Sequence, residues 1–305
     1  MEGSGIGREE NGMNDIWSKH VQGTKTLYYS RKLRFNDMFA ERYKALFDVN
    51  EDRSLRILEI GCGPGALAGA LHRWYPKAEV TGVDRDSAFI SFARKHENGI
   101  TFMEGDITAL PFADNSFDVV ISHTVSEHIE PSIFYGVQMR LLKENGICLV
   151  LSSRRGIHIA PDCLSSSDVE KRFWEKAKRY DDTLNQYSIC RYPMNEAQLP
   201  ASMESYGFRN TSTGFVTVDL TPDHPKYSNT IAHEMIDADR YADIDAIDSV
   251  FYKMPEYFTV KEIEEMKRMT HAKYDIRIAQ YDRGERQWDT NVAIIMVIRG
   301  VKFDV

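Results

Sequence analysis

Between residues 55 and 153, short apolar segments alternate with segments whose apolar residues recur at helical spacing, and this alternation constrains the fold most strongly. Alternating strands and helices form βαβ units, which place parallel strands in one sheet with helices on both faces. The segment after residue 106 is too rich in Pro, Asp and Asn for a full helix. The predicted strands are 55–60, 78–84, 100–105, 117–122 and 147–152, and the predicted helices are 66–75, 87–96 and 133–143.

The second half of the chain departs from this alternation. Residues 195–206 have the pattern of a helix, whereas 208–220 and 289–299 are β-rich and are predicted to be neighbouring strands at one sheet edge. Two insertions, 154–192 and 222–286, are predicted to be helical caps on the sheet.

Each insertion carries the signature of a capping box at a helix start. Ser167 precedes Glu170 by three residues, and Thr259 precedes Glu262 by the same spacing. We expect the second of these helices to run to about Met269. The first helix is predicted to bury one apolar stripe, made of Val169, Phe173, Trp174, Ala177 and Tyr180.

Charge and composition exclude several classes of partner. The 305 residues include 46 acidic and 38 basic side chains, a formal net charge of −8. Proteins that grip phosphate backbones usually show a basic excess, so we expect no nucleic-acid partner. No apolar run approaches the roughly 18 residues of a membrane span, and the polar start lacks the apolar stretch of a secretory signal. The four cysteines lack zinc spacing and are expected to be reduced thiols, so the predicted location is cytoplasmic.

A glycine-rich turn follows the first predicted strand and is the first candidate for chemistry. Gly61, Gly63 and Gly65 occupy alternate positions, which lets a ligand approach the backbone where any Cβ would clash. The turn does not match the G-x-G-x-x-G pattern of dinucleotide binders, because Ala66 fills the third site. Taken alone, the glycines are also explained by a tight turn that needs them for structural reasons.

Two acidic residues follow the next two strands. Asp84 ends the second strand, where a carboxylate can accept both hydrogen bonds of a ribose diol, and Asp106 follows the third, where it can accept from an adenine amino group. Each acid could instead be a helix cap or turn former. Because ligands of open α/β sheets bind at the carboxyl ends of strands, three such features together predict an adenosine pocket that offers no Lys or Arg to a phosphate.

These segments resemble the class I S-adenosylmethionine-dependent methyltransferases, in particular the small-molecule branch of the type 11/25 kind. The sequence ILEIGCGPGALA at 57–68 resembles the glycine motif of that family, and VTGVDRD at 80–86 resembles its ribose-binding motif. Residues 105–122 and 141–153 resemble the segments around its fourth and fifth strands. The resemblance covers 55–153, 195–221 and 287–302.

The resemblance implies a Rossmann-like, mostly parallel seven-stranded sheet with an antiparallel C-terminal edge strand. It also implies S-adenosylmethionine as cofactor and S-adenosylhomocysteine as product. The three glycines would line the methionine side, Asp84 would hold the ribose, and Asp106 with Ile107 would hold the adenine. The full set of residues expected at the cofactor is Glu59, Gly61, Cys62, Gly63, Gly65, Asp84, Arg85, Asp106, Ile107, Ser122 and His123.

The end of the fourth strand borders the expected methyl-donor site and holds the candidate base. His123 comes first, and an ordinary imidazole pKa near 6.5 suits proton transfer at neutral pH. The alternative is that His123 only shapes the cofactor pocket. Glu127 and His128 resemble the Glu-His step of the ubiquinone-biosynthesis-like methyltransferases and are expected to order the following loop. No complete ligand set for a metal is visible.

The acceptor site is expected to be enclosed by segments outside the motifs. Residues 17–47 are amphipathic and aromatic, and helices at this position in the family fold over the cofactor. Tyr28, Tyr29 and Arg34 are the predicted lid residues, with Arg34 a possible partner for a carboxylate of cofactor or acceptor; packing on the core is the alternative. The further acceptor candidates are Tyr187, Arg191 and Tyr192.

The sequence thus predicts an enzyme that methylates oxygen or nitrogen of a small organic acceptor by in-line transfer, as a monomer or homodimer. A non-catalytic cofactor-binding protein and, less favoured, an NAD-type oxidoreductase are the alternatives. The predicted layout is a flexible tail at 1–13, lid helices at 14–50, a core at 51–153, 193–221 and 287–305, and caps at 154–192 and 222–286.

Overall fold

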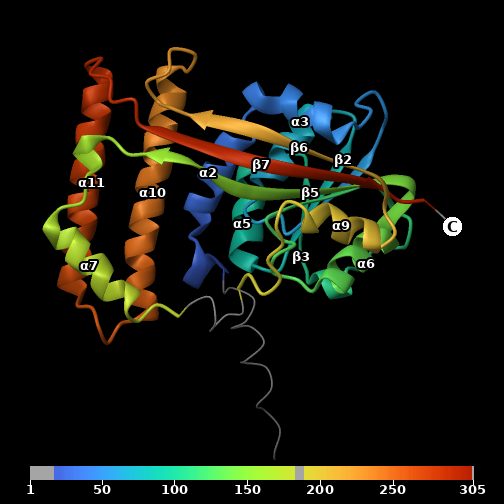
Figure 1. The fold of residues 1–305 in the computed structure, drawn as a ribbon, viewed down its shortest axis with the longest axis horizontal. Coiled ribbons are helices and arrows are strands. Elements are labelled where there is room, and N and C mark those ends of the chain that lie inside the picture. The colour runs from blue at the N-terminus through green and yellow to red at the C-terminus, as the bar shows by residue number, and fades with distance from the viewer. Residues whose placement is uncertain (1–16, 183–188, 304–305) are drawn as a thin grey trace, which may run out of the picture.

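The computed structural model describes residues 17–182 and 189–303, so the predicted tail at 1–13 and Tyr187 lie outside the described residues. A seven-stranded sheet in the order β3-β2-β1-β4-β5-β7-β6 forms its centre (Figure 1). Strands β1 to β5 run parallel, and β7 runs antiparallel between β5 and β6. The predicted fold class is confirmed, with β6 as the outermost strand. The strands are β1 (Arg56–Ile60), β2 (Glu79–Asp84), β3 (Thr101–Glu104), β4 (Phe117–His123), β5 (Leu142–Ile159), β6 (Arg209–Leu220) and β7 (Thr290–Val301).

Helices cover both faces of the sheet because successive strand residues point to opposite sides. In β1, Ile57 packs in a core with the helices before and after that strand, whereas Leu58 packs in a second core on the other face. The first face carries α2 (Thr24–Arg34), α3 (Ala40–Phe47), α4 (Ala66–Trp74) and α5 (Ser87–His96), and the second carries α6 (Pro131–Leu141) and α9 (Gln198–Ser205).

Strand β5 is much longer than the sequence predicts. It continues through the first residues of the expected cap, and Ile157 and Ile159 pair with Val292 and Thr290 of β7 after a register shift. Residues 154–159 therefore belong to the sheet, which corrects the predicted helical character of the 154–192 insertion at its start. Cross-strand pairing to a segment more than 130 positions away in the chain is a tertiary effect that local pattern does not encode.

The predicted cap 222–286 is a helical hairpin, with α10 (Asn229–Lys253) and α11 (Val260–Asp282) side by side at one end of the sheet (Figure 1). Helix α7 (Asp168–Lys178) packs against it. Both predicted capping boxes are present. Within the predicted stripe, Phe173 and Ala177 are buried in the hairpin's core. Val169, Trp174 and Tyr180 are exposed, so the stripe is narrower than predicted because only one edge of α7 contacts the hairpin.

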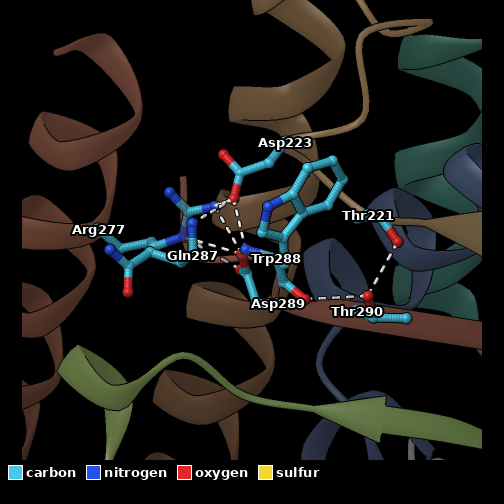
Figure 2. A network of polar contacts seen from close by, with 7 residues as sticks. All are labelled: Thr221, Asp223, Arg277, Gln287, Trp288, Asp289 and Thr290. Carbon is cyan, nitrogen blue, oxygen red and sulfur yellow. Dashed lines mark hydrogen bonds and ion pairs between the residues drawn. The ribbon is translucent and has the colours of Figure 1, made fainter. Parts of the chain in front are cut away.

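Helix α11 extends beyond Met269 to Asp282 because its last turns are anchored. Arg277 is fully buried and binds two carboxylates, Asp223 after β6 and Asp289 before β7 (Figure 2). Asp223 also accepts hydrogen bonds from the backbone amides of Gln287 and Trp288. This cluster joins the hairpin to the ends of the two outer strands.

The same hairpin holds α2 against the sheet. Thr26 of α2 donates a hydrogen bond to Asp245 of α10, and Tyr29 stacks on Tyr241 with ring centroids 5.4 Å apart. None of the helices in the described ranges is both long and apolar enough to cross a bilayer.

Candidate active site

A cavity of about 450 Å³ opens at the carboxyl ends of β1, β2, β3 and β4. The glycine turn after β1, the acid at the end of β2 and the acid after β3 all line it, as the sequence predicts for ligands of open α/β sheets. Residues from outside these strands complete the wall. Those from the N-terminal helices are Trp17, Leu27 and Arg31, those after β4 are Val125, His128, Ile129, Glu130 and Ile133, and those near α9 are Ile189, Arg191 and Tyr192.

The glycine turn brings its backbone to the cavity wall at two positions. Gly61 and Gly63 have φ values of +67° and +54°, a left-handed conformation that glycine adopts without steric cost. A Cβ on Gly61 would lie 2.5 Å from Val125 Cγ2, and one on Gly63 would lie 3.0 Å from Arg31 Nη1. Gly65 does not line the cavity. A Cβ there would lie 2.9 Å from the Phe102 ring, so a glycine at this position allows that ring to pack closely.

Asp84 is held rigidly at the cavity wall. Its Oδ2 accepts a hydrogen bond of 2.8 Å from the Gly63 amide, and its Oδ1 accepts one of 2.9 Å from the Asp86 amide. Burial raises the pKa of the Asp84 carboxyl, while these amides oppose that rise. The acid thus ties the end of β2 to the glycine turn and presents a fixed acceptor to the cavity.

Three more of the predicted cofactor residues line the cavity, namely Arg85, Asp106 and Ile107. Asp106 also caps a short 3₁₀ turn, since its Oδ1 accepts from the Thr108 amide at 2.8 Å. Asp106 therefore has the capping role that was the alternative, and it also lines the cavity.

Four predicted cofactor residues lie behind the wall instead. Glu59, Cys62, Ser122 and His123 are all essentially buried and do not line the cavity. Burial raises the pKa of the Glu59 carboxyl well above its usual range, with the Arg31 guanidinium acting in the opposite direction. Adjacency to the motif in sequence therefore did not place these side chains on the cavity wall.

His123 is not positioned as a base. Its ring is fully buried edge-on to Phe35, and Nε2 lies 3.1 Å from Ser153 Oγ. Burial, followed by the charges of Arg31 and Arg34, lowers the pKa of His123 well below its usual value. The imidazole is therefore neutral and sealed behind the wall, which corrects the sequence-based assignment of His123 as the candidate base.

This buried neutral imidazole predicts a stability loss in acid. The unfolded chain binds a proton at His123 near pH 6.5 and the native state does not, so unfolding free energy falls as pH drops below that value, by at most about 1.4 kcal/mol per pH unit. Urea unfolding of the wild type and of His123→Gln between pH 7.5 and 5 tests this. The variant should show a shallower decline, with exposed His271→Gln as the matched control; equal slopes in wild type and His123→Gln would contradict the assignment.

His128 connects three separate segments at the cavity. Its ring meets Trp17 edge-on at 4.8 Å, and its Nδ1 accepts a hydrogen bond of 3.1 Å from the Cys190 amide. The neighbouring Glu127 carbonyl accepts another, at 3.0 Å, from the Tyr192 amide. The Glu-His step thus fastens residues 189–192 to the loop after β4. The expectation that it orders this loop remains a prediction that these contacts favour.

The predicted lid residues of α2 do not line the cavity, whereas another residue of this helix does. Tyr28 donates a hydrogen bond to Glu97 at 2.8 Å, Tyr29 packs on α10, and Arg34 is not part of the wall. Arg31 lines the cavity and donates from Nη2 to Thr124 Oγ1 at 2.9 Å. Its spacing of four from Leu27, one helical turn, is the signal in the sequence that could have identified it.

Thr124, which accepts this bond, has an unusual backbone. Its φ of +54° is costly for a β-branched residue. Such outliers persist only where surrounding contacts enforce them, and they cluster at functional sites. Here the amide of Thr124 donates to the Leu151 carbonyl at 2.9 Å, which keeps the turn after β4 in place. No feature of the sequence signals this strain.

The sequence pattern described as a methyltransferase domain matches residues 58–150, from β1 into β5. Residues 58–150 are therefore similar to a methyltransferase domain. The resemblance to class I S-adenosylmethionine-dependent methyltransferases is confirmed over this segment.

Curated relatives of the methyltransferase domain cover part of the chain. A fatty-acid O-methyltransferase of Mycolicibacterium smegmatis is 38% identical over 103 residues, which are 32% of this chain and 37% of that protein. A malonyl-[acyl-carrier protein] O-methyltransferase of Legionella pneumophila is 30% identical over 175 residues, 56% of each chain. The chain thus spans between about a third and just over half of the length of these relatives.

A solved structure extends the likeness in fold. Phosphoethanolamine N-methyltransferase 2 of Haemonchus contortus, in complex with S-adenosyl-L-methionine, aligns with a TM-score of 0.52 and 17% identity over 96% of this chain and 60% of that one. At this identity the likeness concerns the fold alone. Within the cavity, the methyltransferase domain supplies the glycine turn, Asp84 and Asp106, whereas Trp17, Arg31 and residues 189–192 come from outside it.

Proposed function

We propose that this protein transfers a methyl group from S-adenosylmethionine to an oxygen or nitrogen of a small organic acceptor. The observation that carries the proposal is the convergence of the glycine turn, Asp84 and Asp106 on one cavity at the carboxyl ends of β1 to β3. The two curated relatives described above are O-methyltransferases, which supports oxygen as the acceptor atom.

The cavity fits the proposed cofactor in shape and chemistry. Gly61 and Gly63 line the cavity and carry no side chain, so an amino-acid moiety can lie against their backbone. Asp84 would accept hydrogen bonds from the ribose hydroxyls, and Arg31 beside Gly63 would pair with the carboxylate. Val83, Phe89, Ile107 and Leu110 offer an apolar surface to the adenine.

When bound, S-adenosylmethionine supplies an electrophilic methyl group on a positively charged sulfur. The chain's own residues contribute position: in-line attack needs the acceptor atom about 3 Å from that carbon, and fixing it there lowers the barrier by about 7–11 kcal/mol. Trp17, His128 and the 189–192 segment close the cavity around the acceptor side and limit access of water.

The experiment that tests this proposal is calorimetric titration of the full chain with S-adenosylmethionine and S-adenosylhomocysteine, with NAD as the comparison ligand. We expect adenosyl-ligand binding in the micromolar range, on the order of typical enzyme KM values, and no binding of NAD. Binding of NAD alone would instead favour the oxidoreductase alternative. Adenosyl binding without turnover of any acceptor would favour the non-catalytic alternative. A cytoplasmic location and a monomeric or homodimeric state remain predictions of the sequence.

A further inference from the structure

The cavity is lined by arginines and by apolar side chains. The acids and the histidine that also line it form hydrogen bonds within the protein. Resting on the proposed function, we infer that the methyl acceptor is a monocarboxylate with an apolar body, which is converted to its methyl ester. Arg191 is the residue inferred to bind the acceptor's carboxylate.

The first step concerns bases among the described residues that line the cavity. His128 uses Nδ1 to accept the Cys190 amide, which places its proton on Nε2, 4.0 Å from Glu127 Oε1. Both oxygens of Asp84 accept backbone amides. With His123 sealed behind the wall, neither imidazole offers a free nitrogen to an acceptor.

The remaining carboxylates of the cavity wall are exposed to solvent and accept hydrogen bonds from residues close to them in the chain. Asp106 is exposed and binds Thr108 through both its amide and its hydroxyl. Glu130 is exposed and accepts from Ser132 Oγ at 2.6 Å. A hydroxyl acceptor needs a base in its transition state, and an amine must first lose a proton at neutral pH. A carboxylic acid is already ionised at pH 7, so its methylation needs neither a base nor the prior loss of a proton.

The second step concerns charge. Arg31, Arg85 and Arg191 line the cavity, and no carboxylate in the part of the chain that the structure describes forms an ion pair with them. Arg31 lies beside the glycine turn and is assigned to the cofactor carboxylate. Arg191 also lines the cavity, and it belongs to a different segment, residues 189–192, which His128 and Glu127 hold by hydrogen bonds. We assign Arg191 to the acceptor. Its planar guanidinium can bind a carboxylate through two parallel hydrogen bonds.

The third step concerns the acceptor's body. The cavity wall includes the apolar and aromatic side chains of Trp17, Ile129, Ile133, Ile189 and Tyr192. Burying an apolar chain against such side chains is favourable in proportion to the area removed from water. The surface therefore suits an amphiphilic acid better than a small polar one.

The chemical step balances without any further reactant. A lone pair of the carboxylate oxygen forms the O–C bond, the C–S bond breaks, and its electron pair returns to sulfur. The anionic acceptor and the sulfonium become a neutral ester and a neutral thioether, and no proton moves. Methylation by this route should be independent of pH over the range where the acid is ionised and the protein is folded.

The experiment supplies the full chain with methyl-labelled S-adenosylmethionine and straight-chain acids of four to sixteen carbons, beside primary alcohols and amines of equal length. We expect the label to appear in the methyl esters of the acids. The rate of this reaction should not change between pH 6.5 and 8.5, and alcohols and amines should give at least about tenfold less product. Arg191→Gln should raise KM for the acid about tenfold or more, with unchanged S-adenosylhomocysteine affinity. Exposed Arg179→Gln, at the residue that follows α7, is the matched control and should behave as wild type.

The outcomes separate this inference from the proposed function. Faster methylation of alcohols or amines would overturn the carboxylate assignment, as would adenosyl-ligand binding without turnover of any acid. Ester formation with an unchanged KM in Arg191→Gln would overturn the role of that residue. Failure of the adenosyl ligands to bind would instead refute the proposed function itself.

Discussion

Replacing Arg277 by alanine is expected to lower the unfolding free energy by about 3–5 kcal/mol, because it removes the only cation between a buried and a largely buried carboxylate within the cluster that Figure 2 shows. The Arg277 side chain is 0% exposed, and those of Asp223 and Asp289 are 2% and 13% exposed. Its Nη2 lies 2.9 Å from Asp223 Oδ2 and 2.6 Å from Asp289 Oδ1. Without the guanidinium, Asp223 and Asp289 would remain shielded from water but would have no positive charge beside them.

Urea unfolding at neutral pH measures this effect. Arg283→Ala is the matched control: it removes an arginine just beyond α11 whose partner, Glu285, is as exposed as itself, so the loss should stay below about 1 kcal/mol. The triple variant Arg277→Met, Asp223→Asn, Asp289→Asn removes all three charges and should recover much of the loss. Similar losses in Arg277→Ala and Arg283→Ala would refute the cluster's role.

The consequence should reach the cavity. The cluster anchors α11 to the ends of β6 and β7, α11 packs on α10, and α10 holds α2, which carries Arg31. A hairpin loosened at Arg277 should therefore also weaken binding of the adenosyl ligand.

Asp84→Ala is expected to weaken S-adenosylhomocysteine binding by about tenfold to a hundredfold. Hydrogen bonds to a charged acceptor contribute about 1.5–3 kcal/mol, and the substitution also releases the Gly63 amide that Asp84 holds at 2.8 Å. Both the proposed ribose contact and the hydrogen bond to the glycine turn depend on this carboxylate.

Calorimetric titration of the variant checks this expectation, with circular dichroism confirming that the chain is folded. Asp84→Asn keeps the volume and one acceptor oxygen, so its affinity should lie between those of wild type and Asp84→Ala. Asp118→Ala is a control at the opposite end of the sheet, where the acid pairs with Lys143 at 2.8 Å, and it should leave affinity unchanged. A folded Asp84→Ala protein with wild-type affinity would show that the cavity does not bind the cofactor as proposed.

Much of the core could be predicted because its signals are local. The helix at 87–96 has the predicted bounds, since Asp86 caps it through the Ala88 and Phe89 amides and its apolar residues recur at helical spacing. The strand at 147–152 was predicted too short at both ends, because its start at Leu142 pairs with β4 and its extension to Ile159 pairs with β7. Both capping boxes were correct, since each is made within four residues.

The sequence by itself determined the sheet, the glycine turn and the acids at the ends of β2 and β3. Chain connectivity brings the carboxyl ends of parallel strands to one edge wherever the strands form. Only the tertiary structure decided which side chains reach the cavity. His123 and Arg34 are turned into the protein while Arg31 and Arg191 face the cavity, because α2 is oriented by α10 and the 189–192 segment is fastened by His128. Those contacts join residues between about 60 and 220 positions apart, and no local pattern in the sequence specifies them.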